Sequence, residues 1–136
     1  MMSEQRRGPA FPDFDQAVAF HHALMQRLGL ESEGVTNEAR LRGTLDRARQ
    51  VAQGGRGDII TMAAFLVFGL IKDEPFGKYS VQTGLALTLA FLLRNGVPLM
   101  VEQEELAGLG LGIAQGEVFA GMIEMWMREC VRGGRW

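Results

Sequence analysis

The chain of 136 residues has one cysteine, one tyrosine and only four prolines. A lone thiol, Cys130, cannot form a disulfide within the chain, and no cysteine pair has the spacing of a metal site. Stability must therefore come from a hydrophobic core, and a chain of this length can bury well over half of its unfolded surface. The composition is compatible with a reducing cytoplasm, where we expect the protein to act.

An excess of basic charge is also missing. The formal net charge is −2 and the pI is about 5.7. Because phosphate binding depends on lysine and arginine, we expect no nucleic-acid partner. Several arginines nevertheless fall close together in the sequence. We interpret them as the exposed face of a helix, with a local basic patch as the alternative: Arg40, Arg42, Arg47, Arg49 and Arg56.

Long hydrophobic runs are absent as well. The longest, Ile59 to Ile71, is shorter than the roughly 20 residues that cross a bilayer, so we expect a buried helix and no membrane partner. Residues 1–12 are polar and lack the apolar segment of a secretory signal. We predict that they form a flexible tail, and that residues 13–136 form a single domain.

What the sequence does contain is apolar residues at helical spacing. From Phe14 to Leu28 they recur every three or four positions, and Gly29 can end that helix. Thr36 or Asn37 can cap a second helix, which leads to a glycine-rich loop at 53–58. No sustained strand alternation is present. We therefore predict an all-α fold, a compact helical bundle around a buried central helix hairpin.

Two strongly apolar helices form the predicted hairpin. The first runs from Ile59, after a possible cap at Asp58, to about Lys72. We expect Ser80 to cap the second, which ends at Arg94 before Asn-Gly. Two further helices are predicted at 103–111 and 116–132. In the last of these, helical spacing groups Met122, Met125 and Trp126 and sets Met127 to the side. We interpret this as one buried stripe and one partly exposed residue, with an adaptable partner-binding face as the alternative.

The loop between the hairpin helices reads Glu-Pro-Phe-Gly-Lys-Tyr-Ser-Val-Gln-Thr from position 74 to 83. Together with the apolar helix ending in Asn-Gly, it resembles the Fic/Doc family, which includes the death-on-curing toxin. There, a His-Pro-Phe-x-Asp/Glu-Gly/Ala-Asn-Lys/Gly-Arg loop leads into such a helix. Segments 20–29, 34–45 and 113–128 are similar to the family's opening, second and closing helices, so the resemblance covers roughly positions 13–132.

The resemblance implies a set of site residues and the loss of most of their chemistry. Glu74 stands at the general-base histidine, Lys78 at the metal-binding acid and Gln82 at the arginine. The family's small residue, asparagine and Lys/Gly become Tyr79, Ser80 and Val81, whereas Pro75, Phe76 and Thr83 match. The implied nucleotide and phosphate loop, with no metal ligand, is Glu74, Pro75, Phe76, Gly77, Lys78, Tyr79, Ser80, Val81, Gln82 and Thr83.

These replacements predict little or no catalysis. An exposed glutamate titrates near 4.3, so Glu74 is a weak base unless burial raises its pKa. Lys78 would repel Mg²⁺, Tyr79 would crowd a phosphate, and Gln82 lacks the charge that stabilises a transition state. We expect a Doc-like protein of the toxin-antitoxin type that needs no cofactor and acts through a protein partner. The family suggests an antitoxin-like helical segment or a translation-factor-like target.

Three other interpretations stay open. A divergent transferase would move a phosphoryl or adenylyl group from ATP with Mg²⁺ to a protein hydroxyl, with Glu74 as base and Ser80, Gln82 and Thr83 as phosphate contacts. A structural homo-oligomer would use exposed Met and Phe side chains. The loop at 72–78 is otherwise an ordinary charged connection between helices.

The only histidines, His21 and His22, are neighbours on the first helix. Adjacent helical residues point about 100° apart and do not form a two-ligand metal face. We therefore predict that His21 is a packed or hydrogen-bonded histidine rather than a ligand or catalyst.

Overall fold

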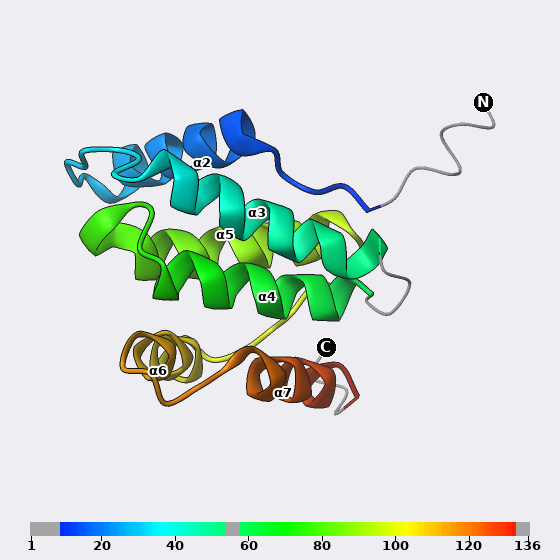
Figure 1. The fold of residues 1–136 in the computed structure, drawn as a ribbon. Helices are drawn as coiled ribbons and strands as arrows, with labels where there is room; N and C mark the ends of the chain where they lie inside the picture. The colour runs from blue at the N-terminus through cyan, green and yellow to red at the C-terminus, as the bar shows by residue number, and fades with distance from the viewer. Residues whose placement is uncertain (1–8, 54–57, 133–136) are drawn as a thin grey trace.

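The computed structural model describes residues 9–53 and 58–132, which form α-helices and one 3-10 turn without a strand. The predicted all-α fold is confirmed. The helices lie in three tiers (Figure 1). From the N-terminus these tiers are α2 (Phe14–Leu28) with α3 (Glu38–Gln53), α4 (Ile59–Lys72) with α5 (Ser80–Arg94), and α6 (Gln103–Ala114) with α7 (Ala120–Arg132).

Helix α4 is the centre of the fold, as its composition predicts. It packs against α3, α5, α6 and α7, and most of its side chains are buried. Phe65 is an exception, with 39% of its surface exposed. Burying one large aliphatic side chain stabilises the fold by about 1.5–3 kcal/mol, so this single helix contributes a large share of the core.

Local caps set the ends of the helices largely where the sequence indicates. Asp13 forms a capping box with Gln16 at the start of α2, and Gly29 ends that helix at φ 67°. The Asp58 carboxylate accepts a hydrogen bond of 3.0 Å from the Thr61 N–H at the start of α4. Of the two alternatives for α3, Asn37 is the cap, because its Oδ1 accepts from the Arg40 N–H at 3.0 Å.

Glycines let the central helices approach closely. A Cβ added to Gly69 on α4 would lie 2.7 Å from Cγ2 of Thr44 on α3. A Cβ on Gly84 of α5 would lie 3.0 Å from Cγ1 of Ile71. Side chains at these two positions would push α3 and α5 away from α4, so the packing of the core requires glycine there.

Several predicted details are wrong. The methionine pattern is the reverse of the prediction, because Met127 is buried whereas Met122 and Met125 are exposed by 52% and 70%. The face of α7 that packs on the core instead consists of Ile123, Met127 and Cys130. The spacing identifies which residues share a stripe, but the packing partner decides which stripe is buried.

The last two helices also have different limits from those predicted. Helix α6 continues to Ala114, and α7 begins only at Ala120. The glycines of α6 do not end the helix. Gly110 and Gly112 lie inside it, where an added Cβ would clash with Val81 and Val118, so glycine is required there by packing. Gly116, at φ 80°, turns the chain between the two helices.

Residues near the end of the predicted tail make defined contacts. Ala10 exchanges two hydrogen bonds of 2.9 Å with the side-chain amide of Asn95, and Pro12 is buried. Phe11 packs edge-on against Phe91 with ring centroids 5.3 Å apart. Residues 10–12 are therefore attached to the end of α5. The remainder of that tail before residue 9, most of the glycine-rich loop, Arg56 and residues 133–136 lie outside the described residues.

Polar contacts hold α7 against the rest of the bundle. The Arg128 guanidinium bonds to Asp58 at 3.1 Å, the Thr61 hydroxyl of α4 donates to Glu124 at 3.0 Å, and the Trp126 indole donates to Glu105 of α6 at 2.8 Å. The hydrogen bonds from Arg128 lower the pKa of Asp58 to about 2. Among the described helices, none combines the length and apolar character needed to span a bilayer.

The close approach at Gly69 generates a stability prediction. Gly69→Ala should lower the free energy of unfolding by about 1–3 kcal/mol, because Thr44 is hydrogen-bonded to Asp73 and cannot move away freely. Gly108→Ala is the matched control, since nothing lies within 4 Å of its added Cβ. It should be neutral or stabilising by up to about 1 kcal/mol. Urea unfolding measures both, and equal effects would contradict the packing described.

Candidate functional site

The segment that carries the Fic/Doc resemblance lies between α4 and α5. Asp73 ends α4, and Glu74 follows at φ 51°, a left-handed conformation that costs a non-glycine residue about 1 kcal/mol or more. Gly77, at φ 61°, then opens the 3-10 turn η1 (Gly77–Tyr79), which runs directly into α5. The Thr36 N–H donates to the Pro75 carbonyl at 2.8 Å and fixes the segment against the start of α3.

The backbone N–H groups of this segment are largely used within it. The Phe76 N–H donates to Ser80 Oγ at 3.0 Å, and the Gly77 N–H donates to the Glu74 carbonyl at 3.1 Å. The Tyr79 and Ser80 N–H groups donate to the carbonyls of Phe76 and Gly77. A phosphate bound at a helix N-terminus needs such donors free. Here it would have to break several internal hydrogen bonds.

Ser80 does not cap α5, which corrects the prediction. It is the first residue of the helix at φ −67° and ψ −31°, whereas an N-cap residue has an extended backbone. Its hydroxyl instead accepts from the Phe76 N–H one turn back. Tyr79 occupies the cap position and makes no side-chain capping bond.

The residues that match the family pattern belong to the core. Pro75, Phe76 and Thr83 are all buried. The Phe76 ring stacks on the imidazole of His21 with centroids 4.3 Å apart and an interplanar angle of 16°. Their burial agrees with the role that the resemblance implies for them, which is to build the loop and seat it on the core.

His21 joins three segments, as predicted for a hydrogen-bonded histidine. Its Nδ1 lies 2.7 Å from Thr83 Oγ1 on α5, and its Nε2 lies 2.7 Å from Ser32 Oγ in the connection after α2. The side chain is fully buried, and this burial, with a smaller contribution from His22, lowers its pKa. A neutral imidazole can donate from one nitrogen and accept at the other, so both hydroxyls are satisfied.

The residues that depart from the family pattern face outward. Glu74, Lys78 and Gln82 are exposed, and Lys78 Nζ lies 5.3 Å from the centroid of the half-buried Tyr79 ring. Val81 packs against Gly110 of α6. Of the three residues expected to contact phosphate, only Gln82 is exposed, because the Ser80 and Thr83 hydroxyls are buried and hydrogen-bonded as described. The fold does not bring these three side chains together at the surface.

A cleft of about 470 Å³ lies beside this segment and is named here the motif cleft. Its charged residues are Glu31, Glu33 and Lys78, so acidic side chains outnumber basic ones. This balance disfavours a polyphosphate and matches a neutral or cationic group better. Thr36, Phe76 and Tyr79 complete much of its wall. Within the residues that the structure describes, no cluster of three acidic, histidine or cysteine side chains is arranged to hold a metal ion.

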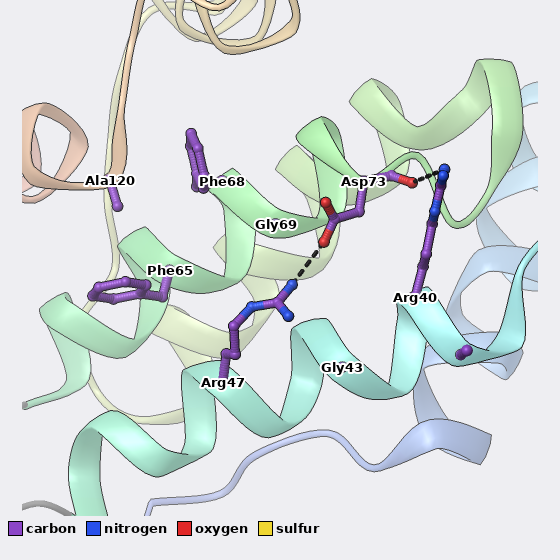
Figure 2. Close-up of a pocket in the computed structure, with 9 residues that line it drawn as sticks. Arg40, Gly43, Arg47, Phe65, Phe68, Gly69, Asp73 and Ala120 are labelled. Atoms are coloured by element: carbon purple, nitrogen blue, oxygen red, sulfur yellow. Dashed lines mark hydrogen bonds and ion pairs between the residues drawn. The ribbon is translucent and has the colours of Figure 1, made fainter.

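A larger hollow of about 640 Å³ lies between α3, α4 and the start of α7, and is named the arginine groove (Figure 2). Two exposed arginines reach across from α3 to Asp73. Arg47 forms an ion pair of 2.7 Å with the Asp73 carboxylate, and Arg40 donates to the Asp73 main-chain oxygen at 3.1 Å. The full lining is Ala39, Arg40, Gly43, Arg47, Phe65, Phe68, Gly69, Asp73 and Ala120.

The groove clarifies the arginine-rich stretch of the sequence. Arg42 pairs with Glu38 at 2.9 Å and Arg49 with Asp46 at 3.4 Å, and both lie outside the groove lining. Of the described arginines in this stretch, only Arg40 and Arg47 line the groove. Arg56 lies outside the described residues. The groove was not predicted from the sequence, because it depends on which faces of α3 and α4 stay uncovered. The spacing of Arg40 and Arg47 on one helical face was the available signal.

Comparisons with known proteins give no match: no protein-family model matches the chain, and no curated protein is found as a relative.

The burial of His21 predicts a pH-dependent stability. Its folded pKa lies below the ordinary value of 6.5, so the unfolded chain binds more protons in the window between the two values. The stabilising contribution is complete above pH 6.5 and is lost as the pH falls through the folded pKa. Urea unfolding at a series of pH values from 7.5 to 5 should therefore give a decreasing free energy of unfolding.

Two substitutions identify the titrating group. His21→Gln should flatten this pH dependence, because the buried titratable ring is gone. His22→Gln should keep most of it, since burial of His21 is the larger cause of the lowered pKa. An unchanged slope in His21→Gln would show that another group is responsible.

Proposed function

We propose that this chain is a Fic/Doc-like domain that has lost transferase chemistry and acts by binding another protein. It belongs, on this proposal, to the toxin-antitoxin type of which the death-on-curing toxin is an example. We place its action in the cytoplasm, where a single buried thiol such as Cys130 stays reduced.

The observation that carries the proposal is the internal bonding of the motif segment. The N–H groups of Phe76, Gly77, Tyr79 and Ser80 already have acceptors within the segment. A phosphate that took these N–H groups would break the internal hydrogen bonds, each of which contributes about 0.5–1.5 kcal/mol of net stability. A nucleotide phosphate must supply that free energy before it gains any net affinity.

The side chains at the reactive positions support the same proposal. Glu74 is exposed to solvent and is not enclosed with a substrate-binding group. Lys78 brings a positive charge where the family binds a metal ion, and Gln82 brings none where the family has an arginine. General base, metal and charge stabilisation act as a unit, and the loss of one element often costs about a hundredfold in rate.

On this proposal, the function is carried by a protein partner. The family precedent supplies two types, an antitoxin-like helical segment and a translation-factor-like target. Exposed apolar side chains also permit self-association: Leu111, Phe119, Met122 and Met125 are each more than half exposed. A dependence of molar mass on dilution, measured by light scattering, would identify a homo-oligomer.

The first experiment is a calorimetric titration of the protein with ATP, with and without Mg²⁺. We expect no binding heat up to about millimolar ATP, because the phosphate-binding N–H groups are occupied. Micromolar affinity, especially if it requires Mg²⁺, would overturn the proposal and favour a divergent transferase.

A second assay tests the transferase directly. Incubation with ATP labelled at either the α- or the γ-phosphate should transfer no label to the chain or to added protein. If label is transferred, Glu74→Ala decides whether Glu74 is the base, since its exposed side chain is not needed for folding. Loss of transfer would assign that role, and unchanged transfer would exclude it.

A further inference from the structure

The arginine groove has two chemically different sides. Phe65, Phe68 and Ala120 form an apolar side, where Phe68 also lies near Phe119 with ring centroids 6.3 Å apart. Arg40 and Arg47 lie on the α3 side, and Figure 2 shows both side chains reaching from α3 toward Asp73. An occupant of the whole groove must therefore present an apolar surface beside a polar one.

The groove carries more positive than negative charge. Asp73 is the acidic residue in its lining, and its carboxylate pairs with Arg47. Arg40 bonds to a main-chain oxygen of Asp73, which is neutral, so its charge is not matched by a carboxylate within the lining. Guanidinium groups have a fork of donors that fits a carboxylate with two parallel hydrogen bonds. An acidic side chain is therefore the complementary group.

The groove follows the helix axes. Arg40, Gly43 and Arg47 share one face of α3 and span two turns, about 10 Å. Phe65 and Phe68 are three residues apart on α4 and lie along the opposite wall. Glycine at position 43 leaves the floor between the arginines open. A groove with a charged wall on α3 and an apolar wall on α4 matches an amphipathic helix that presents residues at i, i+3 or i+4 and i+7.

We propose that the arginine groove binds an acidic amphipathic segment of a partner protein, with its apolar side chains on Phe65 and Phe68 and a carboxylate on Arg40. This inference rests on the proposed function, because it says where the partner of that function docks. The motif cleft is the less suitable site for such a segment, since Glu31 and Glu33 on its wall would repel an acidic chain.

The test uses the full chain and a displayed library of random 16-residue peptides. Peptides that survive selection should be enriched in Asp and Glu together with Phe, Leu or Met at helical spacing. A synthetic copy of the most enriched peptide is then titrated by calorimetry. Its addition to isotope-labelled protein should shift the NMR signals of residues in the arginine groove more than those of the motif cleft.

Two pairs of variants separate the groove from the rest of the surface. Arg40→Gln should weaken binding of the peptide about tenfold through loss of a charge-assisted hydrogen bond. Arg42→Gln removes the same charge from the same helix outside the groove, and should change affinity less than twofold. Gly43→Leu should abolish binding, because its side chain fills the groove between the arginines. Gly43→Ala should retain binding, because its added Cβ meets only Arg47, at 3.4 Å. Thermal melting of each variant verifies that it is folded.

The outcomes distinguish this inference from the proposed function. Peptides that bind equally well to Gly43→Leu and Arg40→Gln would overturn the groove assignment and leave a protein-binding function standing. Selection of basic peptides, or of none, would also overturn it. Labelled single-stranded RNA that binds the wild type and is lost with Arg40→Gln would assign the groove to nucleic acid instead. The ATP titration tests the loss of nucleotide chemistry independently of all these results.

Discussion

The burial of α4 on nearly every side is the constraint on which the rest of the structure depends. Four other helices pack against it, and each is positioned by the surface that α4 presents. Close approach at Gly69 and Gly84 fixes α3 and α5. The end of α4 is then tied to α3, because the Asp73 carboxylate accepts hydrogen bonds from Thr44 and Arg47. The motif segment starts from this fixed point.

The same constraint divides the motif segment into an inner and an outer set of residues. Phe76, Ser80 and Thr83 face inward, where they support the loop and contact His21 or each other. Glu74 and Lys78 face solvent and make little difference to packing. Reactive groups can therefore be replaced without loss of the scaffold, since the free energy of folding depends mainly on the buried set. On our proposal, this separation explains how a Fic/Doc-like fold persists without its chemistry.

The two hollows differ in charge, and this difference bears on what each can bind. The motif cleft has two glutamates and one lysine, whereas the arginine groove has two arginines and one aspartate. Both lie next to segment 73–79, which contributes residues to each. Electrostatic complementarity selects partners mainly through orientation and rejection of like charge. On our proposal, a site for an anionic segment and a cleft better suited to a neutral or cationic group thus lie at the two ends of one short segment.

The sequence by itself determined the fold class and the limits of α2, α4 and α5, because caps, glycines and apolar spacing act within a few residues. It also indicated the packed role of His21. It did not determine that Ser80 bonds back to Phe76, that Met127 rather than Met125 is buried, or that Arg40 and Arg47 border an aromatic groove. These features depend on contacts between segments far apart in the chain. Only the packed structure decides which helix faces are covered and which charges meet.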